Sequence, residues 1–372
     1  MRGTGRSLRW LVPVVLVLIA VAVGVSGSSA RPTRHEAPDA IGGGTSGVLD
    51  LHQGSALTVA LSGDNHSIVM NFMGNLWTMP ATGGRATRIS SLSQDTAYPT
   101  WSPDGKTIAF QSYKSGNFHI WAMNPDGSNV RELTFGFYDD REPVFSPDGT
   151  QIAFSSDRPP SGSPGGVASG SYNVWVLTLA TGQLTEITHD PVLSNAYYPT
   201  WTPDGSHVTY VDTTHAIDSV AANGQGSVQT LYSNASMTLY SPTYSPDGKN
   251  LAYVGQGSAG SGGPTSVNGG PLTQLFVNGQ AVSGNEDVFA FPAPWLSNDT
   301  LVYASNGKIW QRNVTTGTVT AVPFTARVSF ARAAYPMKSY DFSSTAKQQA
   351  VGIVTPALSP DGKQVAFVAL NQ

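Results

Sequence analysis

A Ser-Pro-Asp-Gly tetrapeptide recurs along this chain of 372 residues, each time before a short apolar run such as Ile108-Ala109-Phe110. Proline presets φ at the second position of a turn, aspartate tolerates the third position, and glycine accepts the positive φ that follows. Each copy therefore predicts a tight hairpin between two strands. Clean, near and degenerate copies of the turn contain Asp64, Asp104, Asp148, Asp204, Asp247, Asp299 and Asp361.

The spacing between these aspartates, 40 to 62 residues, is typical of arrays in which every repeat forms a small sheet. The clearest unit runs from Tyr98 to Thr134. In this unit Pro99-Thr100-Trp101 lead into the turn, and strands are expected after it at 107–110, 119–123 and 130–134. Four short strands in every unit predict an all-β fold, a β-propeller of four-stranded antiparallel blades.

The number of blades stays open between six and seven. Six units are complete, whereas the last supplies only strands one and two, at 356–368. Residues 48–52 could join this half-blade and make a seven-bladed ring. Alternatively, six blades close alone and residues 356–372 begin a further blade. A half-blade by itself would expose an unpaired strand edge.

The first 30 residues have the pattern of a secretory signal peptide. Three arginines precede the apolar run 10–26, and the small residues Ser28-Ser29-Ala30 follow it. The alternative is an uncleaved signal-anchor helix, because the run lies near the short limit for spanning a bilayer. Either reading places residues 31–372 outside the cytoplasm: secreted, periplasmic or membrane-anchored, with membrane contact only through 10–26. The expected segments are a signal peptide or anchor at 1–30, a flexible linker at 31–47, blades one to six at 48–325, and a connecting segment with a partial blade at 326–372.

Composition narrows the classes of partner and chemistry. The 40 glycines and 25 prolines suit a turn-rich β protein, and the absence of cysteine excludes disulfides and thiolate ligands. The net charge is −4. It becomes −7 without residues 1–30, which hold three arginines and no acid. An acidic chain is not expected to bind nucleic acid.

A search for catalytic motifs finds no Gly-x-Ser-x-Gly elbow, no phosphate-binding Gly-x-x-x-x-Gly-Lys-Ser/Thr and no His-Glu-x-x-His. The seven histidines are scattered without metal-ligand spacing, and His119 is expected to have a packing or surface role. Hairpin chemistry is sufficient to explain the turn aspartates. We therefore expect no catalytic residue, no metal site and no cofactor.

Binding residues are expected where the chain enters each innermost strand, because these segments run over one rim of a propeller channel and loops on a rigid scaffold carry function. Tyrosines there could anchor a partner, and acids could meet a cationic group. The alternative is that Asp139, Asp140 and Glu142 only cap strands and pair with Arg141 or Arg158. The candidate rim for binding a protein or peptide comprises Asp95, Tyr98, Asp139, Asp140, Arg141, Glu142, Tyr197, Tyr198, Tyr240, Glu286 and Asp287.

The pattern of an aromatic residue, Ser-Pro-Asp-Gly and Ile-Ala-Phe, followed by Ile-Trp and Leu-Thr, resembles TolB-like and tricorn-like β-propeller repeats over most of residues 57–372. The resemblance implies the fold but not one function, because such repeats accompany peptidases, amidohydrolases and non-enzymatic periplasmic proteins. Residues 76–84, 139–143 and 322–362 are also similar to the propeller that precedes a metal-dependent amidohydrolase barrel in certain secreted bacterial proteins. The barrel and its His-x-His motif are absent from this sequence, so the resemblance implies no catalytic residue here.

Three functional hypotheses follow. The first is an exported, non-enzymatic TolB-like propeller that holds a protein or peptide partner at its channel rim. The second is the propeller portion of a split or truncated amidohydrolase, or less so of a serine peptidase, whose catalytic domain is missing from this chain. The third is a structural envelope protein tethered through residues 10–26.

Overall fold

The structure is a computed structural model that describes residues 45–91, 94–159, 171–189, 195–213, 215–257, 271–332 and 352–370. Throughout these ranges the regular elements are β-strands, and no helix has the length and hydropathy needed to cross a bilayer. The predicted signal or anchor helix lies outside the described residues, as does most of the expected linker 31–47. The chain divides into two compact units, Ser46–Ala331 and the combination of Met1–Thr45 with Arg332–Gln372.

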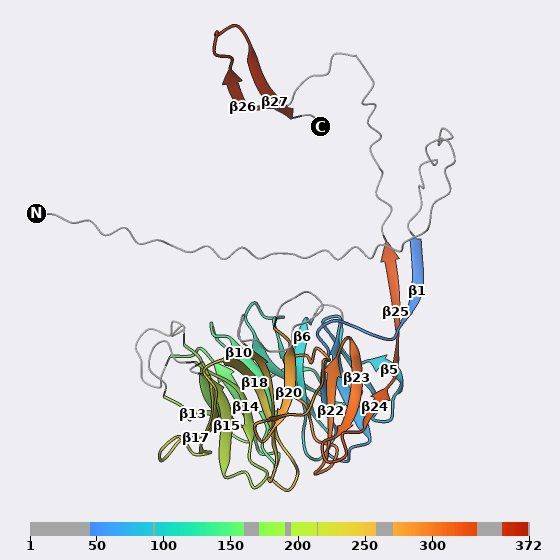
Figure 1. Cartoon of the computed structure of the whole chain (residues 1–372), viewed down its shortest axis with the longest axis vertical. Helices are drawn as coiled ribbons and strands as arrows, with labels where there is room; N and C mark the ends of the chain where they lie inside the picture. The colour runs from blue at the N-terminus through green and yellow to red at the C-terminus, as the bar shows by residue number, and fades with distance from the viewer. Residues whose placement is uncertain are drawn as a thin grey trace, which may run out of the picture. The chain divides into compact units, whose positions relative to one another are not determined.

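The larger unit is a six-bladed β-propeller, and its first five blades each have four antiparallel strands in sequence order (Figure 1). Blade 1 contains β2 (Thr58–Leu61), β3 (Ser67–Phe72), β4 (Asn75–Pro80) and β5 (Gly84–Arg88). Blade 2 contains β6 (Thr96–Trp101), β7 (Ile108–Ser112), β8 (His119–Met123) and β9 (Arg131–Glu132). Blade 3 contains β10 (Asp140–Phe145), β11 (Gln151–Ser156), β12 (Asn173–Thr178) and β13 (Gln183–Glu186).

The remaining blades follow the same order. Blade 4 contains β14 (Ala196–Trp201), β15 (His207–Asp212), β16 (Ala216–Ala221) and β17 (Gln229–Ser233). Blade 5 contains β18 (Met237–Tyr244), β19 (Leu251–Gly257), β20 (Thr273–Val277) and β21 (Gln280–Ala281). Blade 6 contains β22 (Thr300–Ser305), β23 (Lys308–Asn313) and β24 (Val319–Val322). The predicted all-β propeller is therefore confirmed.

Blade 6 differs from the four-stranded expectation at its inner edge. The segment before β22 takes the inner position through two isolated bridges, Val288 to Ser305 and Trp295 to Leu301. Pro292 and Pro294 lie between the bridged residues, and proline has no N–H to donate to a strand ladder. The inner edge of this blade is therefore irregular.

The ring closes between blade 6 and blade 1. Val59 and Met70 of blade 1 share one buried cluster with Val302 and Ile309 of blade 6. The two additional strands of this unit lie at the outer edge of blade 1, in the order β1-β25-β5. They are β1 (Thr45–Leu51) and β25 (Phe324–Arg332), and β25 runs parallel to β5.

The seven-bladed alternative, in which residues 48–52 complete the C-terminal half-blade, is wrong. Strand β1 hydrogen-bonds to β25 instead, and Arg327 of β25 makes a bidentate ion pair with Asp50 of β1 at 2.8 Å. Six blades already bring the first and last sheets into contact, so no gap remains for a seventh.

The Ser-Pro-Asp-Gly turns have the predicted hairpin chemistry. In blade 2 the Ser102 hydroxyl donates to Asp104 at 2.6 Å, and the Thr107 N–H donates to the Ser102 hydroxyl oxygen at 2.9 Å. Gly105 adopts a φ of 69°. Trp101 pairs with Ile108 across the hairpin, which joins strands one and two of the blade. The prediction that the turn aspartates have a structural role is confirmed by these bonds.

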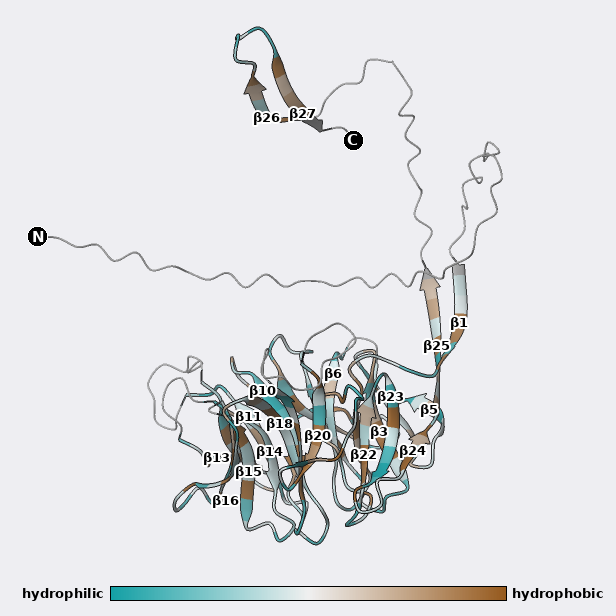
Figure 2. Cartoon of the chain, viewed as in Figure 1, coloured by the Kyte–Doolittle hydropathy of each residue, from teal (hydrophilic) through white to brown (hydrophobic). Residues whose placement is uncertain are grey.

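Strands buried on both faces form the core between blades. All five residues of β7 are buried, and Ala109 and Phe110 are completely inaccessible to solvent. Figure 2 shows hydrophobic stretches along second strands such as β11 and β15. The small alanine lets adjacent sheets approach, while burial of a phenylalanine side chain contributes about 1.5–3 kcal/mol. This packing makes a rigid frame for the channel.

The smaller unit contains one described element, a hairpin of β26 (Gly352–Leu358) and β27 (Val365–Leu370). It repeats the first half of a blade, because the Ser359 hydroxyl donates to Asp361 at 2.5 Å in the turn. Its apolar side chains are solvent-exposed, with Leu358 at 68% and Phe367 at 50%.

Candidate binding site in the central channel

Four inner strands carry the same irregularity, a residue other than glycine with positive φ, followed by proline. The residues are Tyr98 at 49°, Glu142 at 59°, Tyr198 at 54° and Ser241 at 49°. At each of them the pairing register with the next strand shifts, as in a β-bulge. Left-handed backbone costs about 1–2 kcal/mol per residue, and strain of this kind concentrates at functional sites.

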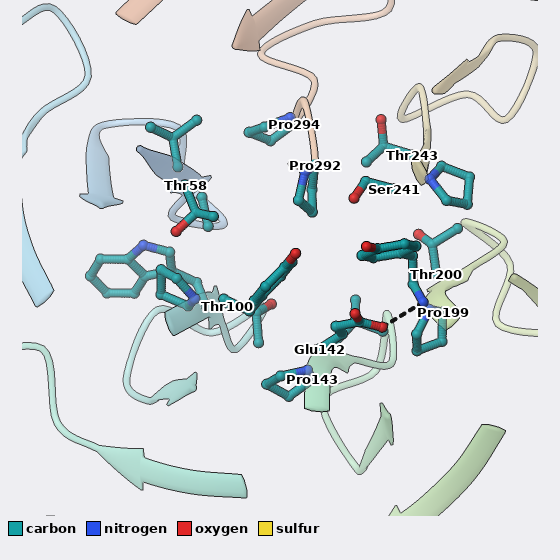
Figure 3. A pocket seen from close by; sticks show the side chains of 18 of the residues that line it. Thr58, Thr100, Glu142, Pro143, Pro199, Thr200, Ser241, Thr243, Pro292 and Pro294 are labelled. Carbon is teal, nitrogen blue, oxygen red and sulfur yellow. Dashed lines mark hydrogen bonds between the residues drawn. The ribbon is translucent and has the colours of Figure 1, made fainter. Parts of the chain in front are cut away.

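The four bulged residues line one cavity at the centre of the ring. Its volume is about 190 Å³, and it is partly open to solvent. Figure 3 shows Thr58, Glu142, Ser241 and Pro292, each from a different blade, around a common central space. The walls are mainly tyrosine, proline and threonine, and Glu142 is the one charged residue among those that line the cavity.

Glu142 is held by groups from its own blade and from both neighbouring blades. Its Oε2 accepts hydrogen bonds from the backbone N–H of Tyr198 at 2.7 Å and from the Ser155 hydroxyl at 3.0 Å. Its own N–H donates to Oε1 of Gln111 in blade 2 at 2.8 Å. Burial raises the pKa of Glu142 to about 7, against the opposing effect of these hydrogen bonds and of the Arg141 charge. The carboxyl therefore changes charge near neutral pH.

Aromatic rings surround Glu142. The ring centroids of Tyr98 and Tyr198 lie 6.3 Å apart, and burial raises the pKa of both phenols. The ring centroid of Tyr98 lies 5.5 Å from that of Phe291, and the Tyr198 centroid lies 6.0 Å from that of Tyr240. Such edge-to-face contacts fix the orientation of the rings.

The aromatic surface continues outward from the cavity. The ring of Tyr197 lies 6.1 Å from Tyr198 and 5.0 Å from Tyr172. The guanidinium of Arg141 lies over the Phe118 ring at 4.4 Å and over the Tyr172 ring at 5.8 Å. The rings and the guanidinium thus form a connected layer at this end of the channel.

Two of the predicted rim acids make the ion pairs expected under the capping alternative. Asp139 pairs with Arg141 at 2.8 Å and accepts the Phe118 N–H at 3.0 Å. Burial acts to raise the pKa of Asp139. The hydrogen bonds to this carboxylate, that from Arg141 foremost, outweigh burial, so the pKa is lowered. Asp140 is completely buried against Arg158 and Ser156. Burial raises the pKa of Asp140 in spite of the Arg158 charge.

The remaining predicted residues do not line the cavity. Glu286 pairs with Arg312 and accepts a hydrogen bond from Tyr303, so it reinforces blade 6. Asp287 accepts the Thr273 N–H at 3.4 Å, and Asp95 is exposed. Of the predicted set, Tyr98, Glu142 and Tyr198 line the cavity directly, and Tyr197 and Tyr240 contact Tyr198.

Sequence reasoning missed Thr58, Ser241, Phe291 and Pro292. A repeated residue-Pro-Thr or residue-Pro-Val pattern after each rim segment could have indicated Ser241, because Ser241-Pro242-Thr243 matches Tyr98-Pro99-Thr100. The blade 6 residues lack that pattern. No group of three or more His, Asp or Glu side chains that could hold a metal occurs in the described part of the chain.

Fold and cavity together define a β-propeller with a central cavity. Residues 57–165 match the TolB beta propeller domain, which confirms the resemblance of the repeats to TolB-like propellers. Comparison with curated protein sequences gives no match.

Solved structures of similar fold come from functionally different proteins. TolB from Acinetobacter baumannii aligns with a TM-score of 0.48 at 20% identity, over 73% of this chain and 65% of that one. A chain of the nidogen/laminin complex aligns with a TM-score of 0.50 at 11% identity, over 76% and 98% of the two chains. A puromycin-hydrolyzing peptidase of Mycobacterium tuberculosis aligns with a TM-score of 0.46 at 16% identity, over 69% and 43%. At these identities the similarity shows the fold alone.

Proposed function

We propose that this protein is a non-enzymatic scaffold that binds a peptide or protein segment at the mouth of its channel. The observation that supports this most is the convergence of Tyr98, Glu142 and Tyr198, from three blades, on one cavity, each with strained backbone. Rigid aromatic side chains around a buried polar group are typical of binding hot spots. Residues held on such a frame bind without a large ordering cost.

The size of the cavity favours a macromolecular partner over a whole metabolite. Small-molecule sites occupy about 300–1,000 Å³, whereas this cavity has about 190 Å³. One side chain or a chain terminus fills that volume. The aromatic layer of Tyr197, Tyr172 and Phe118 outside it then supplies contact area for the neighbouring residues of the partner.

A selection from displayed random peptides tests the proposal. Wild-type protein is immobilised and compared with the triple variant Tyr98→Ala, Glu142→Gln and Tyr198→Ala. We expect peptides enriched on the wild type to bind the triple variant at least tenfold more weakly. Equal affinities for the two proteins would contradict the channel as the binding surface.

A matched control separates the channel from general damage to the rim. The variant Asp95→Asn and Asp287→Asn changes two predicted rim acids that do not line the cavity. Circular dichroism and thermal unfolding identify any variant that fails to fold. Under the proposal the control binds the selected peptides like the wild type, whereas parallel losses in both variants would contradict it.

A second candidate is that the chain serves as the propeller portion of a divided amidohydrolase. The observation in its favour is hairpin β26–β27, which has the turn of an inner strand pair, the bulge at Thr355 (φ 49°) and exposed apolar residues. Strands supplied by another segment would complete a blade with this hairpin and cover its exposed apolar residues. Reading the DNA beyond codon 372 tests this. A frame with a Trp-containing strand and a later His-x-His motif supports it, and an unrelated gene contradicts it.

We also propose that the protein is exported, on the evidence of the N-terminal sequence. The basic residues, the apolar run 10–26 and Ser28-Ser29-Ala30 support cleavage by a signal peptidase. Mass spectrometry of the protein recovered outside the cytoplasm should show a chain that begins near residue 31. Recovery of unprocessed chain in the membrane would instead support the tethered form.

A further inference from the structure

The channel carboxylate has one oxygen that is free to accept a ligand. The hydrogen bonds from Tyr198 and Ser155 both go to Oε2 of Glu142. None of the described residues donates a hydrogen bond to Oε1 of Glu142. Because the Glu142 side chain lines the cavity, a ligand there can reach this oxygen. No cationic residue lines the cavity, so the wall itself offers Glu142 no ion pair.

The neighbours of Glu142 favour a cation over an anion or a neutral group. Tyr98 and Tyr198 contribute aromatic rings to the same wall, and tyrosine rings attract ammonium groups by about 0.5–2 kcal/mol. Prolines 99, 143, 199, 242, 292 and 294 also line it, and they offer no N–H donor for an anion. The nearest guanidinium, that of Arg141, is already paired with Asp139.

We propose that the group that enters the channel is a protonated primary amine, which pairs with Oε1 of Glu142 between the rings of Tyr98 and Tyr198. This deepens the proposed function, because the amine would be the lysine side chain or the N-terminus of the bound segment. The volume is adequate, since a cavity of about 150 Å³ in another protein accommodates benzene. The acidic net charge of the chain, −4, would also attract a cation.

The charge state of Glu142 gives the proposal a distinctive pH dependence. With its pKa near 7, the carboxyl is ionised above that pH and protonated below it. The titratable groups that face it are Tyr98, Tyr197 and Tyr198 from the adjacent inner strands and Arg141 from its own strand. Burial raises the pKa of the three phenols above its ordinary value of 10.0, so the phenols stay neutral on both sides of pH 7. Amine affinity should therefore fall about tenfold for each pH unit below about 7.

Calorimetric titration of the full chain with n-butylammonium tests the proposal. We expect binding above pH 7, release of a proton on binding below pH 7, and no comparable binding of n-butanol or butyrate. Glu142→Gln keeps an oxygen that accepts from Tyr198 and Ser155 but loses the charge, so it should weaken butylammonium binding at least tenfold. Asp126→Asn removes one exposed carboxylate outside the cavity and should bind like the wild type.

Two further titrations identify the source of the amine. Nα-acetyl-lysine amide offers only a side-chain amine, whereas alanyl-alanine amide offers only a terminal amine. Binding of either one that depends on Glu142 supports the proposal. Binding that is equal for butylammonium and butanol, or independent of pH between about 5 and 8, overturns it. If Glu142→Gln does not fold, the pH dependence and the butanol comparison of the wild type decide the matter.

These outcomes are distinguishable from a failure of the proposed function. Peptides selected at the channel that bind equally well after acetylation of all their amines would leave the scaffold function standing and overturn the amine. Butylammonium binding without any selected peptide would support the amine and contradict the scaffold.

Discussion

The backbone N–H of Tyr198 in blade 4 donates a 2.7 Å hydrogen bond to the carboxylate of Glu142 in blade 3. Both residues lie at β-bulges with positive φ, directly before a proline. The bond therefore joins two inner strands where each departs from regular pairing. It fixes the only charged group in the cavity wall, and the behaviour of that group is the most testable feature of the site.

Stability should depend on pH through Glu142. Its pKa is raised in the folded protein, from 4.5 to about 7, so the unfolded chain loses this proton first as pH rises. The contribution to stability is fully present below about pH 4.5 and is lost as pH approaches 7. The loss is on the order of 3 kcal/mol. Glu142→Gln cannot titrate and should gain this amount relative to the wild type between these pH values.

Urea unfolding at about pH 4.5 and about pH 8 measures this difference. Asp126→Asn serves as the control, since hydrogen bonds from Ser128 lower the pKa of Asp126, which is the opposite direction. Parallel stability profiles for the wild type and Glu142→Gln would show that the carboxyl is not held in a desolvated place.

The aromatic rings of Tyr98 and Tyr198 should be energetically coupled. Their centroids lie 6.3 Å apart, so leucine at either position removes the same ring contact, and the double variant loses it only once. An aromatic pair contributes about 0.5–1.5 kcal/mol beyond the area it buries, which is the coupling expected from a double-mutant cycle by urea unfolding. Strictly additive effects of Tyr98→Leu and Tyr198→Leu would indicate that the two rings do not interact.

The bulge at Ser241 should reverse the usual ranking of alanine and glycine. Both substitutions remove the weak hydroxyl bond to the Ala290 carbonyl, at 3.4 Å. Only glycine adopts the φ of 49° without strain, so Ser241→Gly should be more stable than Ser241→Ala by about 0.5–1 kcal/mol.

Ser305 is the control for this comparison. It is a fully buried residue of β22, and its φ is not positive. There the alanine variant should be more stable than the glycine variant by about 0.5–1 kcal/mol. Thermal unfolding of the four variants measures both differences. The same ranking at the two positions would argue against strain at the bulge.

The two ion pairs beside Glu142 should differ in their importance. Arg158 pairs with completely buried Asp140, so Arg158→Met leaves a buried carboxyl without its partner and should cost about 3–5 kcal/mol. The pair of Arg141 with Asp139 is partly exposed, and Arg141→Met should cost about 1 kcal/mol or less. Denaturant unfolding of the two variants checks the ranking, and equal losses would contradict it.

Turn chemistry made much of the fold predictable. Bonds among Ser102, Asp104 and Thr107 are local, so their residue types indicate a hairpin wherever they recur. The number of blades could not be decided in this way, because closure depends on a buried cluster that includes Val59 and Val302, which are far apart in sequence. The irregular inner edge of blade 6 also lacks the repeated pattern that identified the others.

The site was harder to predict than the fold. The rim segments contain Tyr98, Glu142 and Tyr198, which line the cavity, but Tyr, Glu and Ser are not residue types that signal positive φ. The bulges at Tyr98, Glu142 and Tyr198 turn these side chains into the cavity, while their neighbours Asp139 and Asp140 form the pairs expected of capping residues. Sequence alone could not separate the two groups, because they are adjacent in the chain.

Hydrogen–deuterium exchange of the wild type with and without a selected peptide tests the central claim most directly. If the partner binds at the channel, protection should increase in the inner strands 96–101, 140–145, 196–201 and 237–244. The outer strands 183–186 and 229–233 should exchange as before. Protection confined to the outer strands or to the hairpin 352–370, with none in the inner strands, would contradict a channel-binding scaffold.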